Sequence, residues 1–178
     1  MPYIVAAVSL LGVVCLSNLV LTVGVIRRLR EHDARLPTGQ PEVAVRPRPM
    51  AAEMAPFTAV TTTGEHLSSS LLPTPTVVAF FSPGCRPCEV AAPRFLRYAA
   101  DLPGGREQVL VIVSGGADAP AYAEQFRPVA RVVVEEPTGP VQTAFGVEGS
   151  PAFGVVDQGG VIGTATRRVA DLPTAVSV

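Results

Sequence analysis

Residues 76–81, TVVAFF, form a run that is too apolar for a strand with one face in water. Such a run predicts a strand in the middle of a sheet, with both faces covered. Two further apolar runs follow at residues 108–113 and 130–134. Three buried strands in one short chain require a layered fold, in which helices cover the sheet.

The segments around these runs indicate how the layers are connected. Residues 89–100, EVAAPRFLRYAA, carry apolar side chains at helical spacing, and Pro93 inside this segment predicts a kink. Two shorter helices are predicted at 119–126 and 139–145, and two strands joined by a three-residue turn are predicted at 152–157 and 161–166. Strands separated by helices and followed by a hairpin indicate an α/β fold with a mixed sheet.

The beginning of the chain has a different character. Residues 2–26 contain no charged side chain, and about 20 such residues suffice to cross the hydrocarbon core as a helix. No basic segment precedes this run, and it is longer than the apolar part of a signal peptide. An uncleaved transmembrane anchor is therefore predicted. Cys15 is interpreted as a packing residue, because the bulky Val14 before it argues against lipid processing.

A linker is predicted after the anchor. Residues 27–54 begin with Arg27, Arg28 and Arg30 and contain several prolines, which argue against a long helix and favour an extended path. A chain of 178 residues has room for one ordinary domain plus attachments. Residues 55–178 are accordingly predicted to form that domain.

Two cysteines lie between the first strand run and the helix after it, in the sequence FFSPGCRPCEV. The start of a helix stabilises negative charge through its unpaired N–H groups and its macrodipole, so the thiolate pKa of Cys85 is expected to be lowered. Arg86 is expected to add to this effect. A Cys-x-x-Cys pair beside strand–helix–strand units predicts a redox pair, with Cys85 as the attacking thiolate and Cys88 as the resolving thiol.

Other roles for the two cysteines fit less well. A structural zinc site needs about four ligands, but beyond the apolar run the chain adds only His32 and His66, which lie far apart in the sequence. No metal site and no cofactor are predicted, and His66 is interpreted as a solvated turn residue. A purely structural disulfide would close too short a loop to remove much entropy from the unfolded chain. The net charge of −1 gives no indication of nucleic-acid binding.

Several motifs resemble one known family. FFSPGCRPCEVAAP resembles the active-site segment of thioredoxin-fold proteins, with Pro93 at the place of their helix-kinking proline. EGSPAF, residues 148–153, resembles the loop whose proline is cis in this fold. Residues 55–67, APFTAVTTTGEHL, are similar to the entry hairpin of the TlpA/ResA thiol-disulfide oxidoreductases. With an N-terminal anchor and a proline-rich tether, the chain most resembles the MauD-like branch of that group, over about residues 55–166.

The resemblance implies a thioredoxin-like mixed sheet and a membrane-anchored enzyme that exchanges disulfides with protein thiols and disulfides. It also implies a membrane redox partner and a cis bond before Pro151, with Ser150 binding substrate through its main chain. The substrate-binding residues expected from it are Arg86, Pro87, Ser150 and Pro151. The family works outside the cytoplasm, whereas the arginines after the anchor favour the cytoplasmic side. An extracytoplasmic domain is expected here.

The chain departs from the family pattern at the residues that handle protons. Ala79 occupies the place of the buried aspartate of thioredoxins, and Ala91 occupies the place of the glutamate of ResA-like proteins. The acid–base partner of Cys88 is therefore not identified, and a distant carboxylate such as Glu135 is only a hypothesis. At the carboxyl end, Pro173 predicts that the last helix is short or absent and that this end is mobile or packs on a partner.

Two alternative functions remain open. A thiol peroxidase of the peroxiredoxin type would use a hydroxyl group near its cysteine, which Ser82 supplies, but a Cys-x-x-Cys pair is not its usual arrangement. A non-enzymatic module for metal delivery would need a later histidine, and none follows His66.

Overall fold

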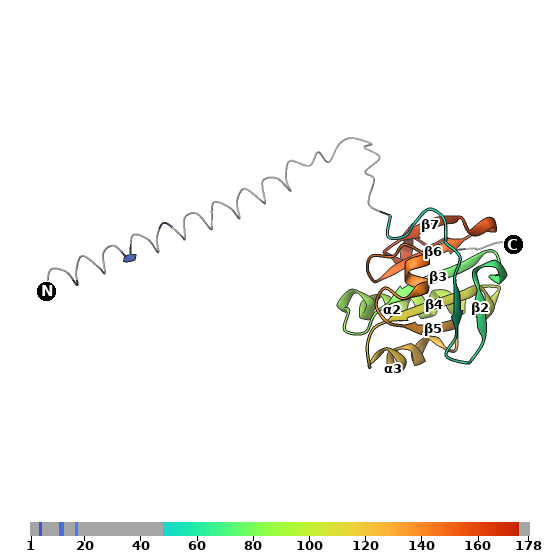
Figure 1. Cartoon of the computed structure of the whole chain (residues 1–178), viewed down its shortest axis with the longest axis horizontal. Coiled ribbons are helices and arrows are strands. Elements are labelled where there is room, and N and C mark those ends of the chain that lie inside the picture. Colours follow the sequence, from blue (N-terminus) through green and yellow to red (C-terminus); the bar gives the residue numbers. More distant parts are fainter. Residues whose placement is uncertain (1–3, 5–10, 13–16, 18–47, 175–178) are drawn as a thin grey trace, which may run out of the picture. The chain divides into compact units, whose positions relative to one another are not determined.

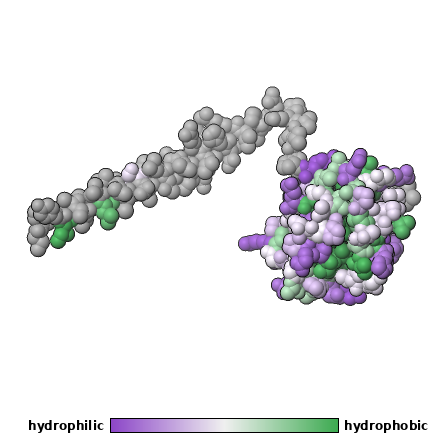
Figure 2. All heavy atoms as spheres, viewed as in Figure 1, coloured by the Kyte–Doolittle hydropathy of each residue, from purple (hydrophilic) through white to green (hydrophobic). Residues whose placement is uncertain are grey.

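The computed structural model describes residues 4, 11–12, 17 and 48–174. The predicted anchor and most of the predicted linker lie outside these residues, so both stay predictions. None of the helices in the described part is long and apolar enough to cross a membrane. The chain divides into two units between Val45 and Arg46, and the fold described below is that of the second unit. Polar and apolar side chains are interspersed over the face of this unit that Figure 2 shows.

A five-stranded mixed sheet forms the centre of the domain, in the order β5-β4-β3-β6-β7 (Figure 1). The strands are β3 (Thr76–Phe81), β4 (Val109–Ser114), β5 (Arg131–Glu135), β6 (Ala152–Val156) and β7 (Ile162–Thr166). Strand β3 pairs in parallel with β4 and antiparallel with β6. All six residues of β3 are buried. The central position predicted for TVVAFF is thereby confirmed, because only a strand covered on both faces buries successive side chains.

The helices are α2 (Arg86–Ala100), α3 (Ala119–Ala123) and α4 (Pro140–Ala144), and short 3-10 turns lie at Ser69–Leu71, Gly105–Gln108, Glu124–Phe126, Gln158–Gly160 and Val169–Asp171. Helix α2 begins three residues before the predicted start, and Pro93 lies inside it. Helix α3 is shorter than predicted, because its expected last turn is a 3-10 turn.

Two apolar cores lie on opposite faces of the sheet, because successive side chains of a strand point to opposite faces. On one face Phe81 packs against residues of α2 and α3. Its ring is stacked on that of Phe126, with centroids 4.7 Å apart, and lies 5.6 Å from the ring of Phe95. On the other face Phe80 lies 5.4 Å from Phe145, which follows α4. Cys88 belongs to the first of these cores.

The entry hairpin implied by the resemblance is present. Strands β1 (Thr58–Val60) and β2 (His66–Ser68) pair antiparallel. In the turn between them, the N–H of Thr62 donates a hydrogen bond of 2.8 Å to the carbonyl oxygen of Val132. The turn therefore covers part of the outer edge of β5. His66 is exposed as predicted, but it begins a strand and does not lie in a turn.

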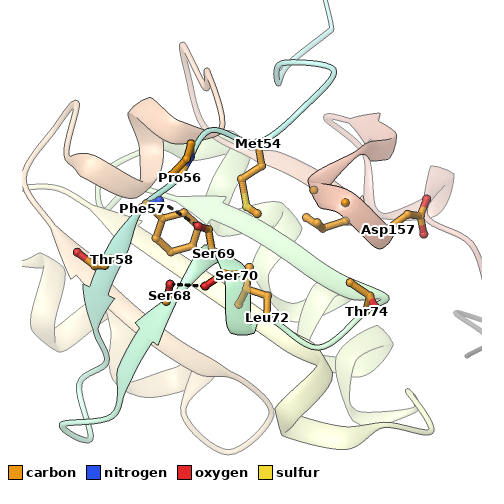
Figure 3. A pocket seen from close by; sticks show the side chains of 13 residues that line it. Met54, Pro56, Phe57, Thr58, Ser68, Ser69, Ser70, Leu72, Thr74 and Asp157 are labelled. Carbon is orange, nitrogen blue, oxygen red and sulfur yellow. Dashed lines mark hydrogen bonds between the residues drawn. The ribbon is translucent and has the colours of Figure 1, made fainter.

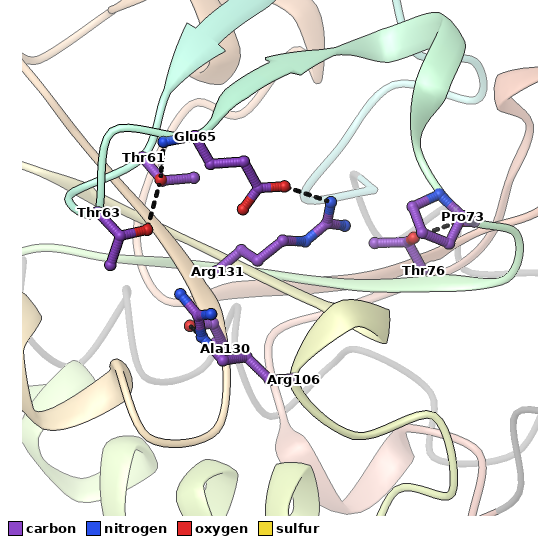
Figure 4. Close-up of polar contacts among 8 residues, drawn as sticks. All are labelled: Thr61, Thr63, Glu65, Pro73, Thr76, Arg106, Ala130 and Arg131. Atoms are coloured by element: carbon purple, nitrogen blue, oxygen red, sulfur yellow. Dashed lines mark hydrogen bonds and ion pairs between the residues drawn. The ribbon is translucent and has the colours of Figure 1, made fainter.

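A buried arginine joins the hairpin to the sheet (Figure 4). The side chain of Arg131 is only 4% exposed, and its Nη1 lies 3.6 Å from Oε1 of Glu65. Its Nε and Nη2 atoms are buried without a hydrogen-bond partner among the described residues. Since an uncompensated buried charge is unfavourable, the ion pair with Glu65 stabilises this corner of the fold.

The predicted boundary between linker and domain is wrong. Residues 48–54 belong to the predicted linker, but the side chain of Met50 is only 2% exposed and lies in the second core. A side chain on Gly154 of β6 would bring its Cβ atom to 2.7 Å from the sulfur of Met50. Prolines argue against a helix in this segment, yet they permit an extended segment to pack on the sheet. The domain therefore begins before Ala55.

The same segment lies along the start of the edge strand β7. Nη2 of Arg48 donates a hydrogen bond of 2.7 Å to the carbonyl oxygen of Ile162, and the N–H of Ile162 donates one of 2.9 Å to Ala52. Glu53 forms an antiparallel bridge with Val161. Part of the outer edge of β7 is thus paired by residues that precede the entry hairpin.

The carboxyl end agrees with the predicted loss of the last helix. The described residues after β7 form only the 3-10 turn Val169–Asp171. The hydroxyl group of Tyr98 in α2 donates a hydrogen bond of 2.9 Å to the carbonyl oxygen of Pro173, and Leu172 is buried. This part of the end is held on α2 and is not free, while the last four residues lie outside the described ones.

Candidate active site

Cys85 and Cys88 form a disulfide where β3 leads into α2. Their Cα atoms lie 5.2 Å apart, within the usual range for a disulfide of about 4.4–6.8 Å. Cys85 is the N-cap residue of α2, and Cys88 lies in its first turn. The structure therefore places the pair at the strand–helix junction that the sequence predicts.

The residues around Cys85 explain why the helix begins there. Gly84 has a φ of +71°, a conformation that residues with a side chain rarely adopt, so it permits the turn out of β3. Pro87 lies in the first turn, where its missing N–H leaves no helical hydrogen bond unmade. The N–H of Cys88 donates a hydrogen bond of 3.3 Å to the sulfur of Cys85. This contact would stabilise negative charge on that sulfur.

The two sulfurs differ in their access to solvent. Cys88 is 0% exposed and packs in the same core as Phe81 and Phe95. Cys85 is partly exposed. An incoming thiol or disulfide therefore reaches Cys85, whereas Cys88 is accessible only through Cys85.

The loop before β6 approaches Cys85. The Ser150–Pro151 bond is cis, as the resemblance implied. The carbonyl oxygen of Ser150 lies 3.5 Å from the sulfur of Cys85. Among the described residues, none accepts a hydrogen bond from the N–H of Ser150. Pro151 lines the same groove as Arg86 and Pro87, so three of the four predicted substrate-binding residues lie together.

Three serine hydroxyl groups join the loop to the sheet, a link that no motif in the sequence predicts. The hydroxyl oxygen of Ser82 lies 3.2 Å from that of Ser114 and 3.2 Å from that of Ser150. Ser82 follows β3 and Ser114 ends β4, so the carboxyl ends of two parallel strands are tied to the loop. No periodic pattern relates these three positions. The available signal was topological, because the carboxyl ends of parallel strands lie at the same edge of a sheet.

No carboxylate is buried beside Cys88 in the described part of the chain, where Arg131 is the only buried charged side chain. Ala79 is buried in the same core as Cys88. Glu135 instead accepts hydrogen bonds of 3.0 and 2.7 Å from the N–H groups of Val141 and Gln142, at the start of α4. Burial raises the pKa of Glu135, and these two hydrogen bonds partly offset that rise. The hypothesis that Glu135 serves Cys88 gains no support.

A cavity of about 730 Å³ lies away from the cysteines, between the entry hairpin and the turn after β6 (Figure 3). Thr74, which precedes β3, and Asp157, which follows β6, are among its lining residues. It therefore lies at the amino end of β3, whereas the disulfide follows the carboxyl end. Strand β3 spans about 20 Å, so this cavity takes no part in chemistry at the disulfide.

Among the comparisons with known proteins, only the one with solved structures finds matches to this chain. No family model matches the chain, and no curated protein matches its sequence. A thio-disulfide isomerase from Thermus thermophilus matches with a TM-score of 0.54 and 20% identity, over 65% of this chain and 84% of the other. The MTB protein dsbF, in its mixed oxidized and reduced forms, matches with a TM-score of 0.51 and 27% identity, over 66% and 87%.

A third solved structure is a secreted Mycobacterium tuberculosis disulfide oxidoreductase described as homologous to E. coli DsbE. It matches with a TM-score of 0.51 and 25% identity, over 68% of this chain and 87% of the other. The fold is therefore the thioredoxin-like α/β fold that the motifs implied. With the Cys85–Cys88 disulfide at the start of α2, this chain is an oxidoreductase of the thiol-disulfide type.

Proposed function

We propose that the chain exchanges disulfides with protein substrates while it is anchored in a membrane by residues 2–26. The observation that carries the exchange chemistry is the asymmetry of the disulfide. Cys85 is partly exposed at the start of a helix, whereas Cys88 is fully buried one turn further along. One sulfur is thus available for an intermolecular bond, and the other is available only to break that bond.

The reaction begins, for the reduced protein, with attack by the Cys85 thiolate on a client disulfide. A bond forms between Cys85 and one client sulfur, and the other client sulfur leaves as a thiolate. The Cys88 thiolate then attacks the sulfur of Cys85, and the first client sulfur leaves. The client gains two electrons, and the protein is left with the Cys85–Cys88 disulfide. The same steps in reverse oxidise a client dithiol.

Ser150 provides the main-chain groups that hold the client. Its carbonyl oxygen faces Cys85 and its N–H is free of partners among the described residues. An extended client segment that adds alongside Ser150 satisfies both groups and brings its own sulfur toward Cys85. Pro151 has no N–H, so it cannot donate the next hydrogen bond to the client segment. Arg86 and Pro87 form the neighbouring surface of α2.

The membrane part of the proposal rests on the sequence. The uncharged run 2–26, the prolines that follow it and the FFSPGCRPC motif favour the MauD-like branch, an extracytoplasmic domain and a redox partner in the membrane. A reporter fused after Val178 tests the orientation, because its activity depends on the side of the membrane. A cytoplasmic Val178 would refute the extracytoplasmic assignment.

Trapping of clients tests the assigned roles of the two cysteines. In a Cys15→Ser background, Cys88→Ser should accumulate disulfide-linked client adducts, because the mixed disulfide at Cys85 is not resolved. Cys85→Ser should accumulate few. Membranes carrying each full-length variant are compared by non-reducing electrophoresis. Equal trapping by both variants, or by neither, would remove the assigned roles.

Three assays on the purified full chain complete the test. Reduction of insulin disulfides and of the neutral reagent 2-hydroxyethyl disulfide measures exchange, while consumption of hydrogen peroxide measures the alternative peroxidase activity. Equilibration with glutathione buffers gives the reduction potential, which separates a reductase from an oxidase because these classes differ by about 150 mV. Peroxide consumption without disulfide exchange would replace the proposed function.

A further inference from the structure

A groove of about 390 Å³ lies beside the disulfide. Helix α2 contributes Arg86, Val90 and Arg94, which follow one another at intervals of four residues and therefore share one face of the helix. Pro151 and the segment after β7, with Arg167 and Arg168, contribute the rest of its polar and apolar lining. The groove thus combines the loop that approaches Cys85 with a surface of α2 that leads away from it.

Part of this surface is apolar. Val90 is 58% exposed, although its side chain is large and hydrophobic. Pro87, Ala91, Val169 and Ala170 add further apolar lining. An exposed apolar strip inside a groove is typical of a binding surface. Such a strip suits the side chains of an extended polypeptide segment.

The charge of the groove is opposite to that of the domain as a whole. Residues 55–178 contain eight arginines and eleven acidic residues. Four of these arginines line the groove, whereas no acidic residue does. Glu89 on the same helix does not line the groove; burial chiefly, and the charge of Glu89 in addition, raises the pKa of Tyr122 in α3. The positive charge is therefore concentrated on the side of α2 that faces the groove.

The arginines differ in how far they are already engaged. Nη1 of Arg167 donates a hydrogen bond of 3.3 Å to the carbonyl oxygen of Gly149, and Nε of Arg168 lies 3.9 Å from the carboxylate of Asp171. Arg86 and Arg94 form no ion pair or side-chain hydrogen bond with any described residue. Two guanidinium groups are thus available, and each can bind a carboxylate through two parallel hydrogen bonds.

We infer that this groove selects client segments that carry aspartate or glutamate close to the cysteine that exchanges with Cys85. The inference rests on the proposed function and adds the class of substrate. Arg94 lies eight residues from Arg86, about 12 Å along the helix, a distance that an extended client segment covers in about four residues. The acidic residues are therefore expected within about four positions of the client cysteine.

Matched peptides test the inference with the full-length protein in an uncharged detergent. Each peptide carries one cysteine as a mixed disulfide with 2-mercaptoethanol, and glutamate, glutamine or lysine at the two nearby positions. The rate of one turnover by the reduced protein should follow the order glutamate, glutamine, lysine. The glutamate peptide should react about three- to tenfold faster than the glutamine peptide at low salt, and the ratio should fall toward one in about 0.5 M NaCl.

Charge reversal on α2 distinguishes the groove from the net charge of the protein. Arg94→Glu should bring the rates of the glutamate and lysine peptides closer together, because a carboxylate then replaces one of the two free guanidinium groups. Arg127→Glu is the matched control, because Arg127 is exposed, lies outside α2 and does not line the groove. This variant makes the same change in net charge and should keep the wild-type ratio of the glutamate and lysine rates.

The possible failures are distinguishable. Equal rates for the three peptides, or the same effect of Arg94→Glu and Arg127→Glu, would overturn the inference and leave disulfide exchange intact. Glutathione disulfide reacting as fast as the glutamate peptide, with the same loss in Arg94→Glu, would assign the groove to a small anionic thiol instead. No reaction with any peptide or with 2-hydroxyethyl disulfide would overturn the proposed function itself.

Discussion

Replacing Met50 by alanine tests whether the segment before the entry hairpin belongs to the folded domain. The side chain of Met50 is 2% exposed and packs over Gly154 in the second core. Burial of a methionine side chain is worth about 1.5–3 kcal/mol, and the cavity left by truncation raises the usual loss to about 2–5 kcal/mol. We expect Met50→Ala to lower the free energy of unfolding by about 3 kcal/mol, within that range.

Urea unfolding of the full chain, followed by circular dichroism, measures this change. With a slope of about 2 kcal/mol per M, the midpoint should fall by about 1.5 M. Met50→Leu is the control that nearly keeps the volume, and it should cost less than about 1.5 kcal/mol. A loss below about 0.5 kcal/mol for Met50→Ala would show that the segment is a free tether, as the prolines alone suggested.

Three further changes test other parts of the fold. Burial raises the pKa of Glu135 above its usual 4.5. The stability of the wild type relative to Glu135→Gln should therefore fall as the pH rises from 4.5 through the raised pKa of Glu135. Urea unfolding that gives the same stability difference between the two proteins at every pH would contradict this. Glu65→Gln should cost about 1–2 kcal/mol, since it leaves the buried Arg131 unpaired while Glu65 itself is 40% exposed, and Arg131→Met in the same chain should recover most of the loss in a thermal melt. Gly84→Ala should cost about 1 kcal/mol because of the positive φ and should slow alkylation or exchange at Cys85; an unchanged melting temperature and rate would refute the role given to this turn.

The strands were predictable because their buried apolar residues are consecutive in the sequence. TVVAFF and the two runs after it consist mostly of consecutive apolar residues, and each lies in an inner or edge strand of one sheet. The position of Met50 was not predictable in this way. Its burial depends on a contact with Gly154, about a hundred residues later in the chain, and no local pattern reports such a contact.

The site shows the same division between local and distant information. The Cys-x-x-Cys pair, the helix that begins beside it and the cis bond before Pro151 follow from short motifs, and the structure contains all three. The groove required residues from α2 and from the end of β7. Arg94 shares a helical face with Arg86, which the spacing in the sequence indicates. The position of Arg167 in the same groove depends on the sheet topology.

Part of each edge of the sheet is paired by residues that precede β3. The hairpin turn covers part of β5 through Thr62, and the segment around Ala52 covers the start of β7. An uncovered edge strand presents a row of free N–H and C=O groups on which a second copy of the chain can add a strand, and aggregation begins in that way. The first residues of the domain thus reduce the number of free edge groups through which copies of the chain can associate at high concentration. Their removal would expose β7 as a template for strand addition between copies.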